Sequence, residues 1–336
     1  MRADRASFTW RDADRTVLFG PGSLRNALGA MVERGLEDFD LLTTPRALGG
    51  AKRLATAAAT IREVAPGGVP EAAERILAGV SSPTVVAMGG GRVIDTAKAV
   101  AAVNGQSVVA IPTTLSGAEM TGIHRLPAGA EERARGLVRP DLVIADPSLM
   151  TSQPESQLRA SAMNAIGHAA DSLYTPFANP VSRMIGLRGV GMIADALDQG
   201  RDDRDRTALA LGSVLCGYAI DSGLFAIHHV ICQTLVRAFG VPHAETNAAM
   251  LPPVMGAMRG RAPGEINALA RALGTDPDSL SARIAELGRP HGLGALGARQ
   301  GRLEEVLDAI QIRPEFKFTP DPPSRDELRA IIEAAW

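Results

Sequence analysis

Apolar strand-like runs and helix-like segments alternate along the first half of the chain. The predicted strands are short and rich in β-branched and aliphatic residues. They cover residues 16–19, 39–44, 84–88, 107–111 and 142–146. Helical spacing follows several of them, with Ser23 expected to cap the first helix. This alternation predicts a parallel sheet covered on both faces, with ligands at the carboxyl ends of its strands.

The pattern changes near Asp146-Pro147. From Glu155 onward strand candidates almost vanish, and apolar positions recur at helical spacing. The predicted helices are 157–174, 180–197, 207–220, 228–239, 244–258, 266–273, 303–312 and 325–335. We therefore expect an α/β domain over 1–150, an all-helical domain over 151–336, and an active site in the cleft between them.

Two polar segments of the second half carry structural expectations of their own. The run from Arg201 to Arg206 is expected to be a solvated connector between helices. Ser324, with Glu327 three residues on, is expected to cap the last helix.

Composition limits the possible functions. The 336 residues are 46% hydrophobic with a net charge of −2, which gives no sign of nucleic-acid or anionic-membrane binding. Two cysteines make no disulfide framework and indicate a reducing compartment. The charged start, Met1 to Arg5, has no apolar signal core, so we expect a cytoplasmic protein.

The glycine run Gly89-Gly90-Gly91 lies where a predicted strand turns into a predicted helix. Glycines let backbone N–H groups approach an anion, and a helix N-terminus adds partial positive charge. A phosphate-bearing ligand is therefore one hypothesis. A tight turn that binds nothing is the alternative that the glycines alone leave open.

Three of the six histidines have informative positions. His168 lies four residues after Asn164, so the two share one face of a predicted helix among small or apolar neighbours. His229 follows His228 near the start of a second helix, and His243 begins a third. Three such imidazoles could converge on a metal or a proton-transfer site. The alternative is that each is a hydrogen-bonded structural histidine.

Several of these segments resemble motifs of the iron-containing alcohol dehydrogenase family. Residues 89–98 are similar to its glycine-rich cofactor loop, and 111–121 to its second cofactor segment. His229 and the run 240–247 resemble its two C-terminal histidine motifs, and 174–180 resembles the stretch after its first histidine helix. The similarity keeps the same order over essentially the whole chain. It implies a dinucleotide-binding domain, a helical domain, NADH or NADPH as cofactor, and a homo-oligomer, expected to be a dimer.

Within that family the chain is most similar to the maleylacetate reductase branch. Metal-dependent members carry an aspartate one turn before the first histidine, whereas this chain has Asn164, as that branch does. The resemblance implies that the cofactor is bound by Gly89, Gly90, Gly91, Asp95, Thr113 and Thr114. It implies that the substrate is lined by Asn164, His168, His229 and His243.

Three further residues leave alternatives open. Arg46 follows the second predicted strand, where ribose recognition commonly occurs, and is either a 2′-phosphate contact or an ordinary exposed arginine. NADH and NADPH therefore both stay possible. Arg92 stands where the family usually has serine, and could bind the pyrophosphate or exclude it. Gln233 replaces a usual histidine, and can donate a hydrogen bond but cannot serve as a general acid.

The donor set also bears on metal binding. Three neutral imidazoles and an amide suit a hard divalent cation less well than three imidazoles and a carboxylate. We therefore expect a metal-independent site. Iron or zinc held by His168, His229 and His243 is the alternative.

Together these residues predict an NAD(P)H-dependent oxidoreductase that transfers hydride to a small carboxylated oxo or enone compound. Maleylacetate, reduced at its carbon–carbon double bond, is the type case. His168, His229 and His243 would stabilise the developing charge, with Asn164 and Gln233 beside them. The alternatives are a non-redox lyase, dehydratase or cyclase on the same scaffold, a metal-dependent alcohol dehydrogenase, and a binding protein without catalysis.

Overall fold

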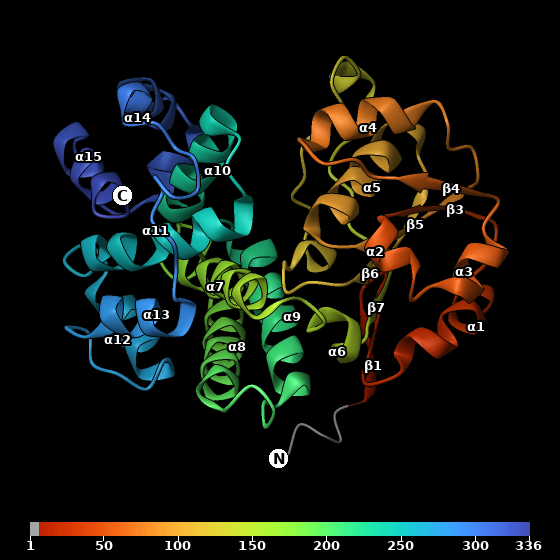
Figure 1. Cartoon of the computed structure of the whole chain (residues 1–336), viewed down its shortest axis with the longest axis horizontal. Coiled ribbons are helices and arrows are strands. Elements are labelled where there is room, and N and C mark those ends of the chain that lie inside the picture. Colours follow the sequence, from red (N-terminus) through yellow and green to blue (C-terminus); the bar gives the residue numbers. More distant parts are fainter. Residues whose placement is uncertain (1–6) are drawn as a thin grey trace. The chain divides into compact units, whose positions relative to one another are not determined.

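The chain folds into two compact units, the first ending at Gln153 and the second beginning at Pro154. The computed structural model describes residues 7–336 (Figure 1), so the charged start, Met1 to Arg5, lies outside the described residues. Unit 1 is built from strands and helices, and unit 2 from helices. The predicted fold class, an α/β half followed by a helical half, is confirmed.

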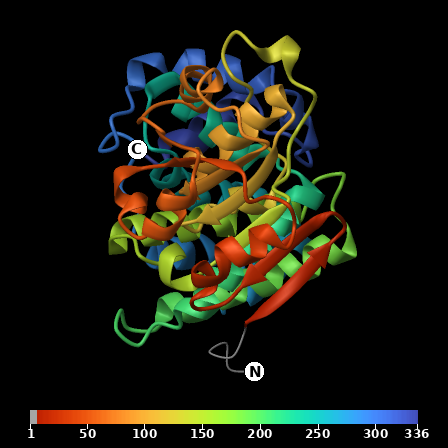
Figure 2. The ribbon, with the colours of Figure 1, turned by 90° about the vertical axis from the view of Figure 1, so that its right-hand side faces the viewer.

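Unit 1 is organised around a seven-stranded sheet with the order β1-β2-β7-β6-β5-β3-β4. Every pairing is parallel except that of β1 with β2, which form an antiparallel pair at one edge (red in Figure 2). The five predicted strands are present, and two edge strands, β1 and β4, were not predicted. Most side chains of these two strands are exposed, so neither carries the apolar run that marks a buried strand. The strands are β1 (Phe8–Asp12), β2 (Arg15–Phe19), β3 (Phe39–Thr43), β4 (Thr60–Glu63), β5 (Thr84–Gly89), β6 (Ser107–Pro112) and β7 (Leu142–Ala145).

Helices cover both faces of this sheet, and the two-residue period of a strand divides the core between them. Val85 and Ala87 of β5 pack with α4 and α5. Val86 and Met88 point to the other face and pack with α1, α2 and α3. These helices are α1 (Ala27–Val32), α2 (Pro45–Leu48), α3 (Lys52–Ala57), α4 (Val69–Leu77) and α5 (Gly91–Asn104), and α6 (Pro147–Met150) ends the unit.

The first helical segment of unit 1 differs from its prediction. A 3₁₀ turn, η2 (Ser23–Asn26), precedes α1, and its cap is Gly22 with a φ of 80°. Ser23 therefore lies inside the turn, and the prediction that it caps the helix is wrong. The left-handed backbone before Ser23 requires the glycine and sets the start of the turn.

Among the described residues, unit 2 contains helices and no strand. They are α7 (Glu155–Ser172), α8 (Pro180–Asp198), α9 (Arg206–Gly223), α10 (Ile227–Phe239), α11 (His243–Met258), α12 (Pro263–Ala272), α13 (Leu280–Gly288), α14 (Leu303–Gln311) and α15 (Arg325–Glu333). Besides η2, the described residues form the 3₁₀ elements η3 (Ala118–Met120) and η4 (Glu131–Arg133) in unit 1, and η5 (Gln300–Arg302) and η6 (Pro314–Phe318) in unit 2. The capping box at Ser324 is confirmed, because its hydroxyl accepts from the N–H of Glu327 and its own N–H donates to the Glu327 carboxylate.

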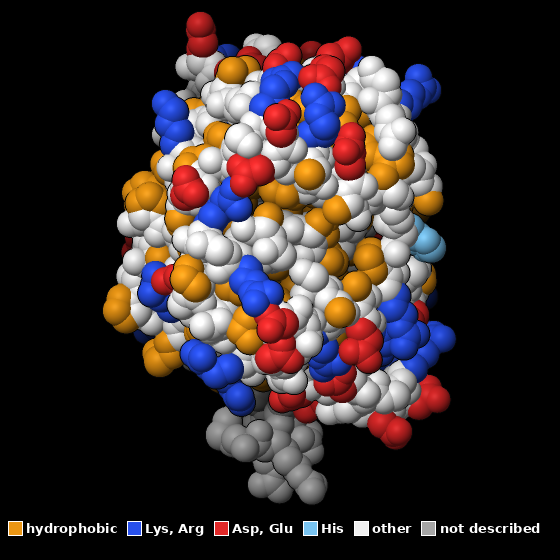
Figure 3. Space-filling view, turned by 90° about the vertical axis from the view of Figure 1, so that its left-hand side faces the viewer, with side chains coloured by type: hydrophobic (Ala, Val, Ile, Leu, Met, Phe, Trp, Pro, Cys, Tyr) orange, Lys and Arg blue, Asp and Glu red, His pale blue; other side chains and the backbone are white. Residues whose placement is uncertain are grey.

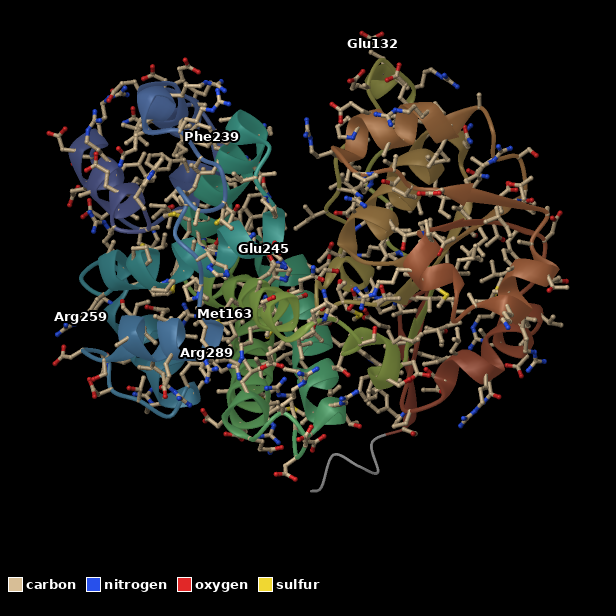
Figure 4. All side chains as sticks on the ribbon, viewed as in Figure 1. Glu132, Met163, Phe239, Glu245, Arg259 and Arg289 are labelled. Atoms are coloured by element: carbon tan, nitrogen blue, oxygen red, sulfur yellow. The ribbon has the colours of Figure 1, made fainter. Side chains whose placement is uncertain are left out.

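Glycines let the helices of unit 2 approach closely. A Cβ at Gly189 of α8 would lie 2.7 Å from the carbonyl oxygen of Gly212 in α9, and the reverse distance is also 2.7 Å. Similarly, a Cβ at Gly288 would lie 2.7 Å from Cγ of Met163 on α7, near the labelled Met163 and Arg289 of Figure 4. Substituting these glycines would force helices apart, so the small residue fixes the packing distance.

The charged run at 201–206 is only partly a solvated connector. Arg204 is buried, and its guanidinium bonds both carboxylate oxygens of Glu155 at 2.8 and 2.9 Å. Together with Arg159, this contact lowers the pKa of Glu155 to about 2. Asp205 caps α9 through the N–H of Ala208. The expectation of a solvated connector is therefore wrong for Arg204, which anchors the run to the start of α7.

The distribution of charge on the surface and the length of the apolar helices are both features that matter in a membrane protein. On the face of the described residues seen in Figure 3, acidic and basic side chains are interspersed with apolar ones. Within residues 7–336 no single helix is long and apolar enough to cross a membrane, and α9 and α10 meet that test only jointly, across a 99° bend.

Packing at the end of β5 predicts the effect of Gly89→Ala. A Cβ at Gly89 would lie 2.5 Å from Cγ2 of Val93, so we expect a loss of about 1–3 kcal/mol in the free energy of unfolding. Urea unfolding measures it. The matched control is Gly29→Ala in α1, which meets no atom within 4 Å and should leave stability unchanged or slightly raised. Equal effects of the two substitutions would contradict this account.

His228 predicts a dependence of stability on pH. Burial lowers its pKa from the ordinary 6.5 to about 3, so below pH 6.5 the unfolded chain binds a proton that the folded chain does not. Its contribution to stability is complete above pH 6.5 and falls by about 1.4 kcal/mol per unit as the pH drops towards 3. We expect urea unfolding between pH 5 and 7.5 to show a shallower slope for His228→Gln than for the unsubstituted chain. Identical slopes would show that His228 is not the group responsible.

Candidate active site

In unit 1 the glycine turn joins the end of β5 to the start of α5. Gly90 is the cap of this helix, and its carbonyl accepts the N–H groups of Val93 and Ile94. The N–H groups before Val93 have no carbonyl within the helix to bond. The first turn of α5 contains no acidic side chain, so its positive end is not neutralised locally. This arrangement is suited to a phosphate.

The second predicted cofactor segment packs directly against this turn. The N–H of Thr113 donates to the carbonyl of Gly89 at 2.9 Å. A Cβ at Gly90 would lie 3.0 Å from Cγ2 of Thr114, and one at Gly91 3.0 Å from Cβ of Ser116. No side chain fits here without displacing a neighbour. The structure thus brings together the three glycines, Thr113 and Thr114.

Two charged residues of α5 have different surroundings. Arg92 is exposed at the second position of the helix. Asp95 pairs with the ammonium of Lys98 at 2.8 Å. Arg92 therefore extends from the surface of α5, whereas the half-buried Asp95 is held by the fully buried ammonium of Lys98.

Lys98 is a residue that the sequence analysis did not single out. Its side chain is fully buried, and Nζ donates to the carbonyl oxygens of Ala118, Thr121 and Ile123 at 3.0, 3.0 and 2.9 Å. These bonds fasten the second cofactor segment to α5. The available signal was a lone lysine within the apolar segment 93–103.

Arg46 does not join the glycine turn. It is exposed on α2, and its guanidinium donates to the carbonyl of Ser152 at 2.9 Å. A cavity of about 200 Å³ nearby is lined by Thr43, Thr44, Pro45, Leu48, Ile61 and Glu63. It lies at the carboxyl ends of β3 and β4, and its acidic residue, Glu63, comes from the unpredicted strand β4.

In unit 2 two of the predicted histidines meet inside the helical packing. His168 of α7 and His229 of α10 stack with 4.8 Å between ring centroids and 25° between ring planes. Nδ2 of Asn164 lies 3.5 Å from Nε2 of His168. His228 meets His229 edge-on, with 4.9 Å between centroids. The structure therefore brings Asn164, His168 and His229 together.

Asp171, which the sequence analysis also passed over, is fully buried beside this pair. One carboxylate oxygen accepts from Nδ1 of His229 at 2.9 Å, and from the N–H groups of Ala226 and His229 at 3.1 and 3.0 Å. The other accepts from the N–H of His228 at 3.3 Å and from the Tyr174 hydroxyl. Its position three residues after His168, on the same helix face, was the available signal.

Burial sets the protonation of the two stacked rings. It lowers the pKa of His229 to about 3 and that of His168 well below 6.5, and His243 lowers both further. Both imidazoles are therefore neutral near pH 7. Within the described residues, Nε2 of His229 and Nδ1 of His168 are buried without a hydrogen-bond partner. One ring nitrogen on each ring is thus available to a ligand.

The other two predicted residues of unit 2, His243 and Gln233, lie on α11 and α10. His243 is exposed at the first position of α11, in the turn that contains the labelled Glu245 of Figure 4. Its Nε2 lies 3.3 Å from Nδ2 of Asn247. Gln233 is half-buried on α10, one turn beyond His229.

The donor atoms around the stacked pair in unit 2 carry no net charge near pH 7. Across residues 7–336, no three His, Cys, Asp or Glu side chains are grouped so that they could share a metal ion. Nδ1 of His229 is already bonded to Asp171, and residue 164 is a neutral amide. The arrangement instead presents two neutral imidazoles for hydrogen bonding to a ligand.

Comparison with known proteins identifies the family of the chain. The model of the iron-containing alcohol dehydrogenase family matches residues 15–147, and that of the C-terminal part of the Fe-containing alcohol dehydrogenase family matches residues 159–336. Maleylacetate reductases of Burkholderia cepacia and Pseudomonas aeruginosa are 31% and 32% identical to the chain, over 95% of each chain. The crystal structure of maleylacetate reductase from Rhizobium sp. strain MTP-10005 has a TM-score of 0.83 at 27% identity, covering 99% of this chain and 98% of that one. The chain belongs to the iron-containing alcohol dehydrogenase family and is an NAD(P)-dependent oxidoreductase.

Proposed function

We propose that this oxidoreductase reduces a small carboxylated oxo or enone compound of the maleylacetate type, without a metal ion. The observation that carries the proposal is the buried, neutral pair of His168 and His229 beside Asn164, where metal-dependent members of the family have a carboxylate. Full-length similarity to maleylacetate reductases supports the substrate class.

The cofactor half of the proposal rests on unit 1. The N–H groups at the start of α5 would hold the pyrophosphate, with Thr113 and Thr114 beside it. Bound NADH or NADPH supplies the hydride. Lys98 and Asp95 would fix the backbone of the second cofactor segment rather than touch the substrate, because the ammonium is fully buried among carbonyl groups.

The substrate half rests on unit 2. Hydride addition to one carbon of the double bond conjugated to a ketone leaves negative charge on the ketone oxygen. Because the amide of Asn164 faces Nε2 of His168, the ring proton of His168 belongs on Nδ1, which would donate to that oxygen. The exposed imidazole of His243 would exchange the proton that completes the reduction with solvent. Gln233 would contribute a hydrogen bond only.

We further propose that NADH is preferred over NADPH. Glu63 lines the cavity at the ends of β3 and β4, where an acidic residue suits a ribose 2′-hydroxyl and repels a 2′-phosphate. Arg46, the residue that favoured NADPH, bonds Ser152 instead.

A homodimer and a cytoplasmic location complete the proposal. Cys216 and Cys232 are buried free thiols, in keeping with a reducing compartment. The relatives named above are reductases, and no finding favours the lyase alternative.

The proposed activity is tested by mixing the purified chain with NADH and maleylacetate and following NADH oxidation. We expect turnover that is unchanged after dialysis against a chelator. His168→Ala should lower kcat by about 10²–10⁴-fold, since it removes the donor to the ketone oxygen. The exposed His291→Ala is the matched control and should leave kcat unchanged. Loss of turnover on chelation would overturn the metal-independent site, and absence of turnover with NADH bound would overturn the substrate.

Glu63→Gln tests the cofactor preference. Removing the carboxylate should raise kcat/KM for NADPH relative to NADH by about tenfold, or 1.4 kcal/mol. Steady-state kinetics with both cofactors measure the ratio. Glu33→Gln removes a charge elsewhere on unit 1 and should not change it. An unchanged ratio in Glu63→Gln would exclude Glu63 from ribose recognition.

A further inference from the structure

We propose that Asp171 is a positioning residue that holds His229 in the tautomer with its proton on Nδ1, so that Nε2 presents a lone pair to the ligand. This inference rests on the proposed function for its ligand, and names the group recognised: a hydroxyl, as in the enol form of the substrate or an alcohol. Asp171 would act only through His229.

The carboxylate of Asp171 is surrounded by hydrogen-bond donors. Three backbone N–H groups, the Tyr174 hydroxyl and Nδ1 of His229 all point at Asp171. A buried carboxylate accepts hydrogen bonds and donates none. The imidazole nitrogen that faces it must therefore carry the proton, and in a neutral ring Nε2 then carries none.

The second ring nitrogen of His229, Nε2, has different surroundings from Nδ1. Nε2 of His229 is buried, and among the described residues it has no hydrogen-bond partner. A buried polar atom without a partner is unfavourable by about 1–3 kcal/mol unless a ligand or water satisfies it. An acceptor left open in this way requires a group that donates.

The imidazole of His168 lies next to that of His229 and supplies a donor. His168 stacks on His229, and the amide of Asn164 faces its Nε2, which leaves Nδ1–H of His168 as an open donor. The two neutral rings thus offer one donor and one acceptor. A hydroxyl has the complementary pair, since its oxygen accepts from His168 and its proton is donated to His229.

A purely structural role for Asp171 makes a different prediction. Its carboxylate also accepts hydrogen bonds from N–H groups at the start of α10. That helix has no side-chain cap of its own. If that were its whole role, loss of the carboxylate would lower stability and leave the tautomer of His229 unchanged. The tautomer therefore separates the two roles.

The test uses the full chain with ¹⁵N-labelled histidine, and His229→Gln assigns the resonances of His229. In the unsubstituted chain we expect a protonated Nδ1 and an unprotonated Nε2. In Asp171→Leu the N–H groups and Nδ1 lose their acceptor and no oxygen replaces it, so we expect the proton to be released from Nδ1 and to appear on Nε2. The same variant should lose at least about 10²-fold in kcat/KM for maleylacetate, with the NADH dissociation constant unchanged within about twofold.

Two further variants act as controls. Tyr174→Phe removes one donor to Asp171 without touching His229, so the tautomer should persist and kcat/KM should stay within about threefold. Asp171→Glu keeps a carboxylate and should retain the tautomer and more activity than Asp171→Leu.

The outcomes distinguish this inference from the proposed function. A protonated Nε2 of His229 in the unsubstituted chain would overturn the inference, even if Asp171→Leu did not fold. An unchanged tautomer and kcat/KM in a folded Asp171→Leu would also overturn it. The spectra need no substrate, so failure to reduce maleylacetate would refute the proposed function while the tautomer is still measured.

Discussion

Backbone N–H groups at the start of a helix need an acceptor, and this constraint organises the candidate residues of both units. In unit 1 the start of α5 carries no acidic residue and faces the glycine turn. In unit 2 the start of α10 is satisfied by the carboxylate of Asp171, which reaches it from α7. An uncompensated helix N-terminus is suited to an external anion, whereas a compensated one is fixed as part of the protein. The same backbone chemistry thus leaves the helix start in unit 1 open to an anion and gives a rigid support for His229 in unit 2.

Burial also determines the protonation state of the histidines in unit 2. His168 and His229 lie where a charged imidazolium is strongly disfavoured, so they remain neutral donors and acceptors near pH 7. In unit 1 the only charge of comparable burial on α5 is Lys98, whose ammonium is surrounded by carbonyl oxygens and Asp95. Lys98 and Asp171 therefore hold backbone in place, and neutral or backbone groups are left to meet ligands.

The sequence predicted what depends on local pattern, and missed what depends on contacts between distant segments. The strand 84–88, the glycine turn and the helix from Pro180 were predictable, because apolar spacing and turn residues determine them locally. Strand β4 was not, since an exposed edge strand lacks the apolar run.

The same limit applies to the candidate site. The shared helix face of Asn164 and His168 follows from their spacing, but the stacking of His168 on His229 depends on how α7 and α10 pack. Asp171 and Lys98 stand in no recognisable catalytic motif of the sequence. Their roles follow from the donors and acceptors that surround them in the folded chain. The resemblance to a known family indicated the histidines, because it compares whole motifs, but it did not indicate these two supports.

The charge balance of unit 2 bears on why residue 164 is an asparagine. A divalent cation among buried imidazoles needs negative charge close by, and metal-dependent relatives supply it with an aspartate at this position. Here the carboxylate nearest to the rings, Asp171, already accepts five hydrogen bonds and faces Nδ1 of His229 rather than the open Nε2. Placing two positive charges beside the rings would leave them largely uncompensated in a medium of low polarity, at a high cost in free energy. Two neutral rings and an amide avoid that cost, and Nδ1–H of His168 can still stabilise a developing oxyanion because a buried hydrogen bond is stronger than one in water. An amide in place of a carboxylate lowers the negative charge available to a cation at this place in the fold, and this is the electrostatic reason for proposing hydrogen-bonded rather than metal-bound chemistry there.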